Sequence, residues 1–217
     1  DMSHIGDCTT NLGDVNEDNS LNVLDITQIA MGILSGEAFN INQMCLADVN
    51  GDGSINIQDL LQLVNMIFDY SDDLLGRSIA AEEVHINIAS NKVLINSEGA
   101  FGGIQITTDG IYSIKETQIP EGWKFYNSDN GIIILNLTGK IQTSPIVISY
   151  TGEIQIIEHL ASDLFGYKIL SRTDSMPLEY QLNNIYPNPF NPITTISYSL
   201  PVENHVKIII YDLLGRQ

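Results

Sequence analysis

Basic residues are missing from the first third of this chain. The protein has 217 residues and a formal net charge of −18, yet residues 1–76 hold 13 Asp or Glu and no Lys or Arg, and the first basic residue is Arg77. Carboxylates at this density repel one another unless cations stand among them. The imbalance argues against nucleic acid as a partner, and it favours bound divalent cations over a merely solvated acidic face.

Long apolar runs and catalytic motifs are also absent from the sequence. No stretch approaches the roughly 18–20 apolar residues of a membrane-spanning helix, so no membrane span is expected. The N-terminal residues show no basic and apolar leader of a signal peptide. The four histidines form no HExxH pattern, and neither GxSxG nor a phosphate-binding loop occurs. The sequence therefore predicts a protein without an active site.

Cysteine is scarce, because Cys8 and Cys45 are the only two. Two thiols without further soft ligands make a poor zinc site. Two free buried thiols remain one interpretation, and a disulfide is favoured if the protein is exported. On the loop-entropy model such a disulfide would stabilise the fold by about 3–4 kcal/mol.

The acidic third carries one twelve-residue pattern twice. Asp48–Asp59 has oxygen-bearing side chains at positions 1, 3, 5, 9 and 12, with Gly53 at position 6. Ca²⁺ takes about six to eight oxygen ligands, and this spacing directs them to one centre. Residues 14–34 repeat residues 48–68 with nine identities in 21 positions, which chance explains poorly. Asn19 replaces the glycine in loop 1, so loop 1 is expected to be the weaker site.

Each loop leads directly into a stretch with helical periodicity. The apolar residues at helical spacing are Ile57, Leu60, Leu61, Val64, Ile67 and Phe68 in the second copy and Val23, Ile26, Ala30, Ile33 and Leu34 in the first. Neither loop follows an amphipathic helix, so each unit is half of a helix-loop-helix motif. One half cannot bury its apolar face alone, and two halves are expected to pack together about a pseudo-twofold axis.

Duplicated loops of this kind, each followed by one helix, resemble the type I dockerin module over about residues 8–70. The resemblance implies two bound Ca²⁺ ions and docking onto a cohesin β-sandwich. The implied side-chain ligands are Asp14, Asn16, Asp18, Asp25, Asp48, Asn50, Asp52 and Asp59, with backbone carbonyls from Ser20 and Ser54 and water-mediated contacts from Asn22 and Asn56. The expected partner-binding residues are Val23, Leu24, Gln28, Ile57 and Gln58.

The middle of the chain switches to the two-residue period of β-strands. After a predicted linker at 71–80, residues 81–170 alternate between apolar and polar positions and are separated by turn signals, which predicts an antiparallel β-sandwich. The run Gly131–Leu135 predicts a central strand buried on both faces. Gly103-Ile104-Gln105 and the turn at 120–123 resemble cohesin-like sandwiches. Trp123, Phe125 and Tyr126 form either core or a sugar-stacking platform, and core is the favoured interpretation.

The C-terminal segment, residues 171–217, is rich in proline. Five of the seven prolines follow residue 176. Tyr186–Pro192 precedes two stretches that are predicted as alternating strands, 194–200 and 206–211, and an Asp-Leu-Leu-Gly-Arg turn ending at Arg216. This pattern resembles the type A C-terminal sorting domain of the type IX secretion system. The resemblance implies a bacterial protein exported across the outer membrane, secreted or attached to the surface, with the type IX machinery as a partner. The family continues beyond the strands seen here, so a partial domain is expected.

The predicted fold is a multidomain α + β chain. A small all-α calcium-binding module (1–70) precedes the antiparallel β-sandwich and a partial immunoglobulin-like β-sandwich. The predicted function is a non-catalytic adaptor that binds a cohesin-like domain in trans. One alternative is a structural spacer, in which the module packs in cis on its own β domain through Leu24, Gln28, Met31 and Gln58. The other is the C-terminal tail of a larger secreted hydrolase.

Overall fold

The computed structural model describes residues 11–36, 39–68, 81–89, 91–139 and 144–174, and in the C-terminal segment 181–182, 185–189, 191–200, 205–212 and 214–216. The chain divides into two compact units, Asp1–Asp174 and Ser175–Gln217. The predicted linker at 71–80 lies outside the described residues. None of the helices in the described part has the length and apolar character needed to cross a membrane.

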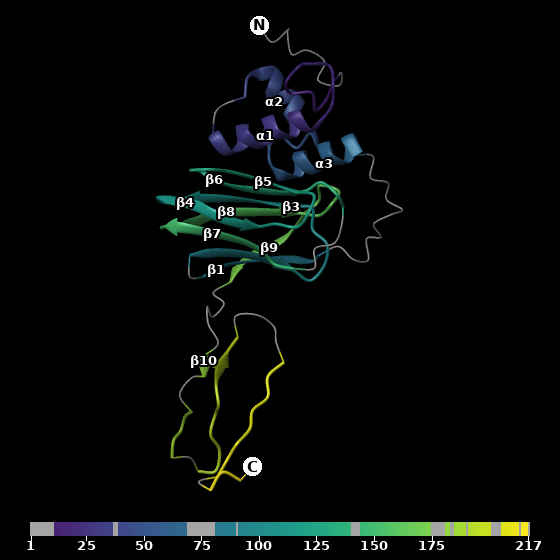
Figure 1. Ribbon diagram of the computed structural model, residues 1–217. Helices are drawn as coiled ribbons and strands as arrows, with labels where there is room; N and C mark the ends of the chain where they lie inside the picture. Colours follow the sequence, from purple (N-terminus) through teal and green to yellow (C-terminus); the bar gives the residue numbers. More distant parts are fainter. Residues whose placement is uncertain are drawn as a thin grey trace. The chain divides into compact units, whose positions relative to one another are not determined.

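The helical part of the first unit contains α1 (Val23–Ser35), α2 (Ile41–Ala47) and α3 (Ile57–Phe68) (Figure 1). Helix α1 begins at Asn22, whose side chain accepts a hydrogen bond from the Leu24 N–H at 2.8 Å. It ends at Gly36, whose φ of 66° is the left-handed conformation that stops a helix. The sequence reasoning missed α2, whose signal is the capping box formed by Asn40 and Gln43.

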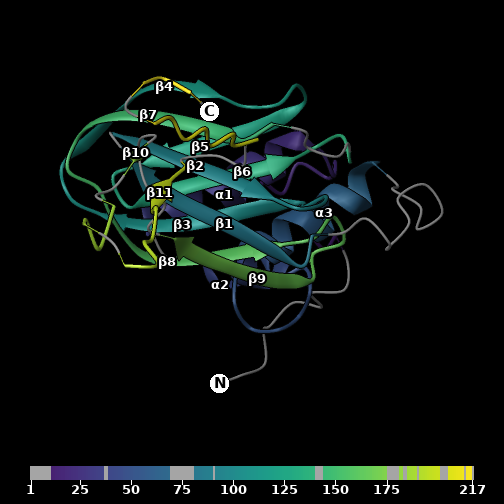
Figure 2. The ribbon, with the colours of Figure 1, turned by 90° about the horizontal axis from the view of Figure 1, so that it is seen from below.

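The β part of the first unit is one curled sheet of nine strands with the order β4-β7-β2-β1-β9-β8-β3-β6-β5 (Figures 1 and 2). The pairs are antiparallel except for β1 with β9, which is parallel. The strands are β1 (Glu83–Ala89), β2 (Lys92–Ser97), β3 (Gly103–Asp109), β4 (Tyr112–Gln118), β5 (Trp123–Ser128), β6 (Gly131–Asn136), β7 (Ile146–Gly152), β8 (Gln155–Ser162) and β9 (Lys168–Asp174).

The two halves of the curled sheet enclose a hydrophobic core. Phe101 and Trp123 lie in this core with ring centroids 5.1 Å apart, and the side chains of Ile86, Ile104 and Ile134 are fully buried beside them. Trp123 is only 8% exposed. The aromatic cluster at 123–126 is therefore packed structure and offers no exposed tryptophan face for a sugar ring.

Strand β6 is buried on both faces, as the sequence predicted. Successive side chains of a strand point to opposite faces of its sheet. Ile132 and Ile134 belong to the core of the sandwich, whereas Ile133 and Leu135 belong to a second hydrophobic cluster with residues of α1 and α3. The outer face of β6 is therefore covered by the helical part of the same chain.

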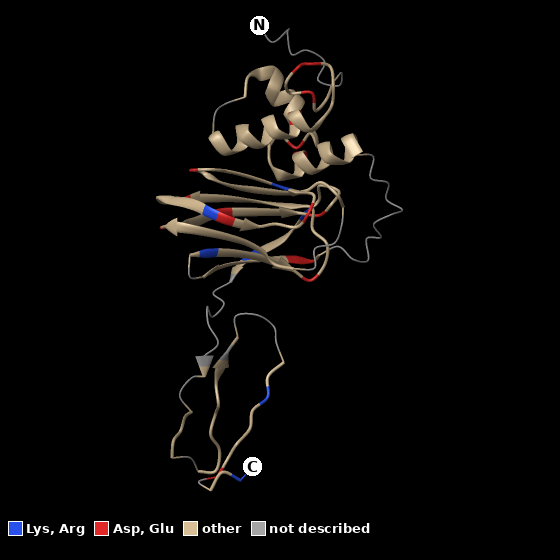
Figure 3. Cartoon of the chain, in the orientation of Figure 1, with Lys and Arg blue, Asp and Glu red and all other residues tan. Residues whose placement is uncertain are grey.

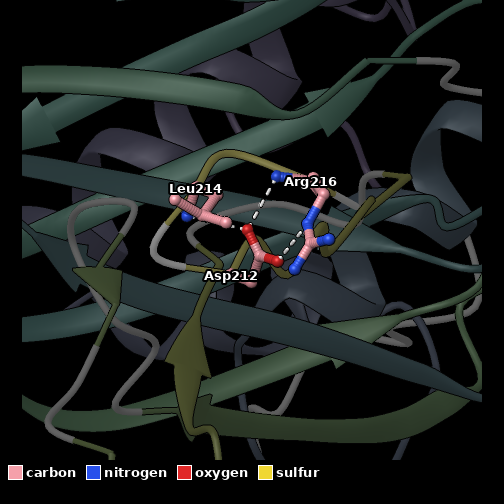
Figure 4. A network of polar contacts seen from close by, with 3 residues as sticks. All are labelled: Asp212, Leu214 and Arg216. Atoms are coloured by element: carbon pink, nitrogen blue, oxygen red, sulfur yellow. Dashed lines mark hydrogen bonds and ion pairs between the residues drawn. The ribbon is translucent and has the colours of Figure 1, made fainter.

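The C-terminal unit pairs β10 (Gln181–Leu182) with β11 (Tyr198–Ser199). The predicted turn forms at Asp212, whose carboxylate accepts the N–H groups of Leu214 and Arg216 at 2.8 and 2.9 Å and pairs with the Arg216 guanidinium (Figure 4). The hydrogen bonds from the Arg216 backbone and side chain lower the pKa of Asp212. The stretch 206–211 was predicted as a strand and is not assigned as one, because no ladder of backbone hydrogen bonds pairs it within the described residues.

Candidate calcium loops and the surface that they position

The two twelve-residue loops have the same internal hydrogen bonds. The first aspartate of each loop accepts the N–H groups of loop positions 5 and 6, at 3.1 and 2.9 Å for Asp14 and at 3.1 and 3.0 Å for Asp48. The last aspartate accepts those of positions 3 and 9, at 3.3 and 3.0 Å for Asp25 and at 3.1 and 2.8 Å for Asp59. These bonds bring the first and last residues of each loop around one centre.

The other proposed ligands join the same networks. In each loop the amide at position 3 donates to the carboxylate at position 5, at 3.1 Å from Asn16 to Asp18 and at 2.9 Å from Asn50 to Asp52. The amide at position 9 donates to the backbone carbonyl at position 7. The atoms joined are Asn22 Nδ2 and Ser20 O at 2.8 Å, and Asn56 Nδ2 and Ser54 O at 3.0 Å. The structure thus brings the sequence-predicted ligands of each loop together.

Loop 1 has non-glycine residues at two left-handed positions where loop 2 has glycine. Asn19 has a φ of 63°, and Gly53 at the same loop position has a φ of 86°. Position 4 is also left-handed, with a φ of 59° at Glu17 and 72° at Gly51. The left-handed conformation costs a non-glycine residue about 1–2 kcal/mol, with Asn among the more tolerant. Loop 1 therefore carries this cost twice, and the strain at Glu17 was not foreseen from the sequence.

Exchanging the residues at loop position 6 should exchange the strength of the two sites. Asn19→Gly should raise the calcium affinity of loop 1 by about two- to fivefold, since glycine relieves a left-handed strain of up to about 1 kcal/mol. The reciprocal Gly53→Asn should lower the affinity of loop 2 by a similar factor. Isothermal titration calorimetry with calcium measures both. An unchanged or reduced affinity in the Asn19→Gly chain would contradict the assignment.

Buried carboxylates without basic partners characterise the loops. Asp25 and Asp59 are fully buried and Asp14 is 4% exposed. Figure 3 shows acidic residues and no basic residue in the described helical part, in agreement with the sequence up to residue 76. A buried, unpaired ionised carboxylate is costly unless a cation compensates it.

Asp59 shows this cost in its pKa. Burial raises the pKa of Asp59 from 3.8 to about 6, and the backbone N–H groups of Asn56 and Asn50 offset part of the rise. Because the folded pKa lies above the ordinary value, ionisation destabilises the metal-free fold. The cost is fully present above a pH of about 6 and absent below 3.8. At neutral pH a bound cation would remove it.

The donor set fits a hard divalent cation. Carboxylate, amide and carbonyl oxygens are the ligands that Ca²⁺ prefers. Among the described residues, no group of three or more His, Cys, Asp or Glu side chains is gathered as a metal cluster. Carboxylates are only part of the oxygen set in such loops, since amide and backbone carbonyl oxygens supply the rest.

Two of the predicted partner-binding residues contact the β-sandwich of the same chain, one at strand β3 and one at the turn between β8 and β9. Ile57 is fully buried in the second hydrophobic cluster, and its N–H donates to the Gln105 Oε1 atom at 3.1 Å. Gln58 Nε2 donates to the Gly166 carbonyl at 3.0 Å. Gly166 has a φ of 88°, and a Cβ there would lie 2.9 Å from the Gln58 carbonyl oxygen, so the close approach requires glycine.

The other predicted partner-binding residues lie elsewhere. Leu24 is 63% exposed and Val23 is half-buried. Gln28 Nε2 donates to the Val15 carbonyl at 3.3 Å, within the helical part. Met31, named in the spacer alternative, is 45% exposed. The structure therefore brings Ile57 and Gln58 to the sheet and leaves the α1 residues Leu24 and Met31 facing solvent.

The sequence reasoning missed several contacts between the helices and the sheet. The Thr27 and Tyr126 hydroxyls are 3.3 Å apart. The Leu34 carbonyl at the end of α1 accepts hydrogen bonds from Ser128 Oγ at 2.8 Å and Asn130 Nδ2 at 3.2 Å. On α3, Asn65 Nδ2 donates to the Leu164 carbonyl at 2.9 Å. The sequence signal for these contacts was strand β6, whose side chains are apolar on both faces. In a two-layer sandwich one face of a strand lies outside the core, so a strand buried on both faces needs a third layer to cover that outer face.

The Cys8–Cys45 disulfide stays a prediction, because Cys8 lies outside the described residues. Cys45 lies on α2, and no cysteine of the described part is free. Intact mass spectrometry of the denatured protein should show that the mass of one chain rises by two hydrogens on reduction. Reduction of an intermolecular disulfide would instead separate two linked chains. Modification of two thiols by an alkylating reagent before reduction would contradict the pairing.

Comparisons with known proteins agree with the duplicated loops and the C-terminal pattern. Residues 12–68 match the family model of the dockerin type I domain, and residues 184–217 match that of the secretion system C-terminal sorting domain. The comparison with curated proteins gives no match. A solved chain from a type I cohesin–dockerin complex of Clostridium thermocellum is 8% identical to this chain, with a TM-score of 0.30. The match covers 42% of this chain and 88% of that chain, and at this score the likeness is weak. The chain therefore contains a type I dockerin domain and a C-terminal sorting domain of type IX secretion, which mark a secreted or cell-surface protein.

Proposed function

We propose that this chain is a calcium-stabilised, non-catalytic docking region in which the dockerin domain binds the β-sandwich of the same chain in cis. The observation that carries the proposal is the shared hydrophobic cluster. Ile57 of α3 and the outward-facing Ile133 and Leu135 of β6 are all fully buried within it. The β-sandwich then acts as a cohesin-like partner.

The full burial of these three side chains supports stable docking. Full burial of an Ile or Leu side chain contributes about 1.5–3 kcal/mol, so these three side chains together supply several kcal/mol. Without the helices, Ile133 and Leu135 would add to an exposed apolar patch on the sheet, which soluble domains rarely leave uncovered. Hydrogen bonds from Gln58 and Asn65 of α3 to backbone carbonyls at the Leu164–Gly166 turn satisfy polar groups at the edge of the cluster.

Two calcium ions would hold the loops in the proposed mechanism. The side chains of Asp14, Asn16, Asp18 and Asp25 would hold the first ion, and Asp48, Asn50, Asp52 and Asp59 the second. Each ion supplies the positive charge that the helical part lacks. The loops then present α1 and α3 at a fixed angle to each other, and binding free energy becomes folding free energy.

A second candidate is binding of a cohesin-like domain in trans through α1. By the internal repeat, Leu24 and Met31 correspond to Gln58 and Asn65, which donate hydrogen bonds from α3 to the turn between β8 and β9. Leu24 and Met31 are 63% and 45% exposed, so this surface is accessible in the docked chain. Neither candidate conflicts with a catalytic region elsewhere in a longer protein.

A cleavable chain tests the proposed docking. A protease recognition sequence inserted at residue 76 of the full chain allows the connection to be cut after folding. In millimolar calcium the two fragments should elute together on gel filtration, and in a calcium chelator they should separate. Fragments that elute apart in calcium, although both are folded by circular dichroism, would contradict docking in cis.

The intact chain distinguishes the two candidates. If the cis surface is occupied, a labelled fragment 78–217 should not bind the uncut chain in calcium. Binding of that fragment with a one-to-one stoichiometry would favour docking in trans through α1.

A further inference from the structure

We propose that Gln105 of β3 recognises the calcium-loaded form of loop 2, so that loop 2 and not loop 1 controls docking. The inference rests on the proposed docking in cis. It assigns a recognition residue on the β-sandwich and gives different roles to two loops of nearly the same sequence.

The contact joins the sheet to the loop itself. Ile57 is at once position 10 of loop 2 and the first residue of α3. The first N–H groups of a helix have no acceptor inside it. Here the Ile57 N–H donates to Gln105 Oε1 at 3.1 Å, whereas the Gln58 N–H donates to Asn56 Oδ1 at 2.8 Å. The start of α3 is therefore capped partly by the loop and partly by the sheet.

The side chains at loop positions 10 and 11 also contact the sheet. The Ile57 Cδ1 atom would lie 3.1 Å from a Cβ built on Gly103, so the isoleucine packs directly on the β3 backbone. Gln58 Nε2 reaches the Gly166 carbonyl at 3.0 Å. Two consecutive residues inside the loop frame thus contact the β-sandwich: Ile57 contacts β3 through its backbone N–H and its side chain, and the Gln58 amide contacts the turn between β8 and β9.

Loop 1 meets the sheet differently. Its positions 10 and 11 are the half-buried Val23 and Leu24, which is 63% exposed. The hydrogen bonds between α1 and the sheet lie further along, where the Thr27 and Tyr126 hydroxyls pair and the Leu34 carbonyl accepts from Ser128 Oγ. A change in loop 1 reaches these contacts only through the body of the helix.

The geometry of loop 2 gives the reason for a dependence on calcium. Asp59 holds the N–H groups of Asn50 and Asn56 at 3.1 and 2.8 Å, on either side of the loop centre. Without a cation, repulsion among Asp48, Asp52 and Asp59 opposes this closed arrangement. Opening of the loop displaces the Ile57 N–H and leaves the half-buried Gln105 oxygen without its partner.

Gln105→Met and Gln105→Glu in the cleavable chain test the recognition residue. Methionine keeps the length of the side chain but removes the acceptor, and glutamate keeps an acceptor oxygen. Gln105→Met should weaken association of the fragments about five- to tenfold, which is the loss expected for one hydrogen bond. Gln105→Glu should bind more tightly than Gln105→Met, and calcium-dependent helicity should be the same in both. Equal affinity of the Met variant and the unmodified chain would overturn the proposal.

Asp14→Asn and Asp48→Asn form the matched pair for the two loops. At a calcium concentration where both variants keep their helicity, Asp48→Asn should weaken association of the fragments about five- to tenfold, as Gln105→Met does. The Asp14→Asn fragments should associate as tightly as the unmodified ones. Adding Gln105→Met to Asp48→Asn should weaken association little further, because both changes remove the same contact. Equal dissociation of the two variants, or full additivity, would overturn the proposal. If the unmodified fragments never associate in calcium, the proposed docking itself has failed, which is a separate outcome.

Discussion

Removal of calcium at neutral pH should lower the midpoint of thermal unfolding of the helical part by on the order of 20 °C. A ligand at about 1,000 times its dissociation constant contributes about 4 kcal/mol to stability. Two such sites contribute about 8 kcal/mol. We expect the docked helical part to unfold together with the unit Asp1–Asp174, and in a unit of that size each kcal/mol shifts the midpoint by roughly 2–4 °C. The physical cause is the set of buried aspartates in a part of the chain without basic residues.

Far-UV circular dichroism with and without a chelator measures this effect. The helical signal should fall on chelation and return with added calcium. Magnesium is the matched control, because it demands a smaller octahedral site and retains its water, so it should not restore the signal at the same concentration. The expected direction also follows from Asp59, whose raised pKa shows that the metal-free fold is penalised above a pH of about 6. An unchanged spectrum and midpoint in the chelator would rule out calcium as a structural element.

Placing a charge on the outer face of β6 should release the helical part from the sheet. Ile133→Asp would bury an unpaired carboxylate within the shared cluster, which costs several kcal/mol and exceeds the contribution of the isoleucine it replaces. Undocking avoids that cost by exposing the carboxylate to water. In the cleavable chain the fragments should then separate even in millimolar calcium.

Two controls make the Ile133→Asp result specific. Ile111→Asp makes the same chemical change at a side chain that is 90% exposed, and co-elution should persist. Ile134→Ala removes a neighbouring side chain that faces the core of the sandwich, and it should destabilise the β fragment by about 2–5 kcal/mol. The Ile133→Asp β fragment should instead keep its fold, as judged by near-UV circular dichroism. Co-elution of the Ile133→Asp fragments would contradict docking through this face.

Local sequence determined the two loops and the two helices that follow them. The proposed ligands of each loop lie within twelve residues of one another, and the bonds that shape the loops join residues two to nine positions apart. Backbone geometry then follows from short-range rules such as capping by Asn22 and termination at Gly36. The burial of strand Gly131–Leu135 on both faces was also predictable from local sequence. Four consecutive apolar residues place apolar side chains on both faces of a strand, so neither face suits water.

Only the tertiary structure decided what covers the outer face of that strand. The contacts that do so join residues far apart in sequence, from Ile57–Gln105 at 48 positions to Gln58–Gly166 at 108. Of two loops with nearly the same pattern, the fold places one against the sheet and leaves Leu24 of the other exposed. Sequence periodicity predicts that one face of a helix or strand is apolar, but it does not predict which surface covers that face. Burial against any apolar surface lowers the free energy of the folded chain. The choice of partner depends on shape and on hydrogen bonds such as those of Gln105 and Gly166, which exist only once the sheet has formed.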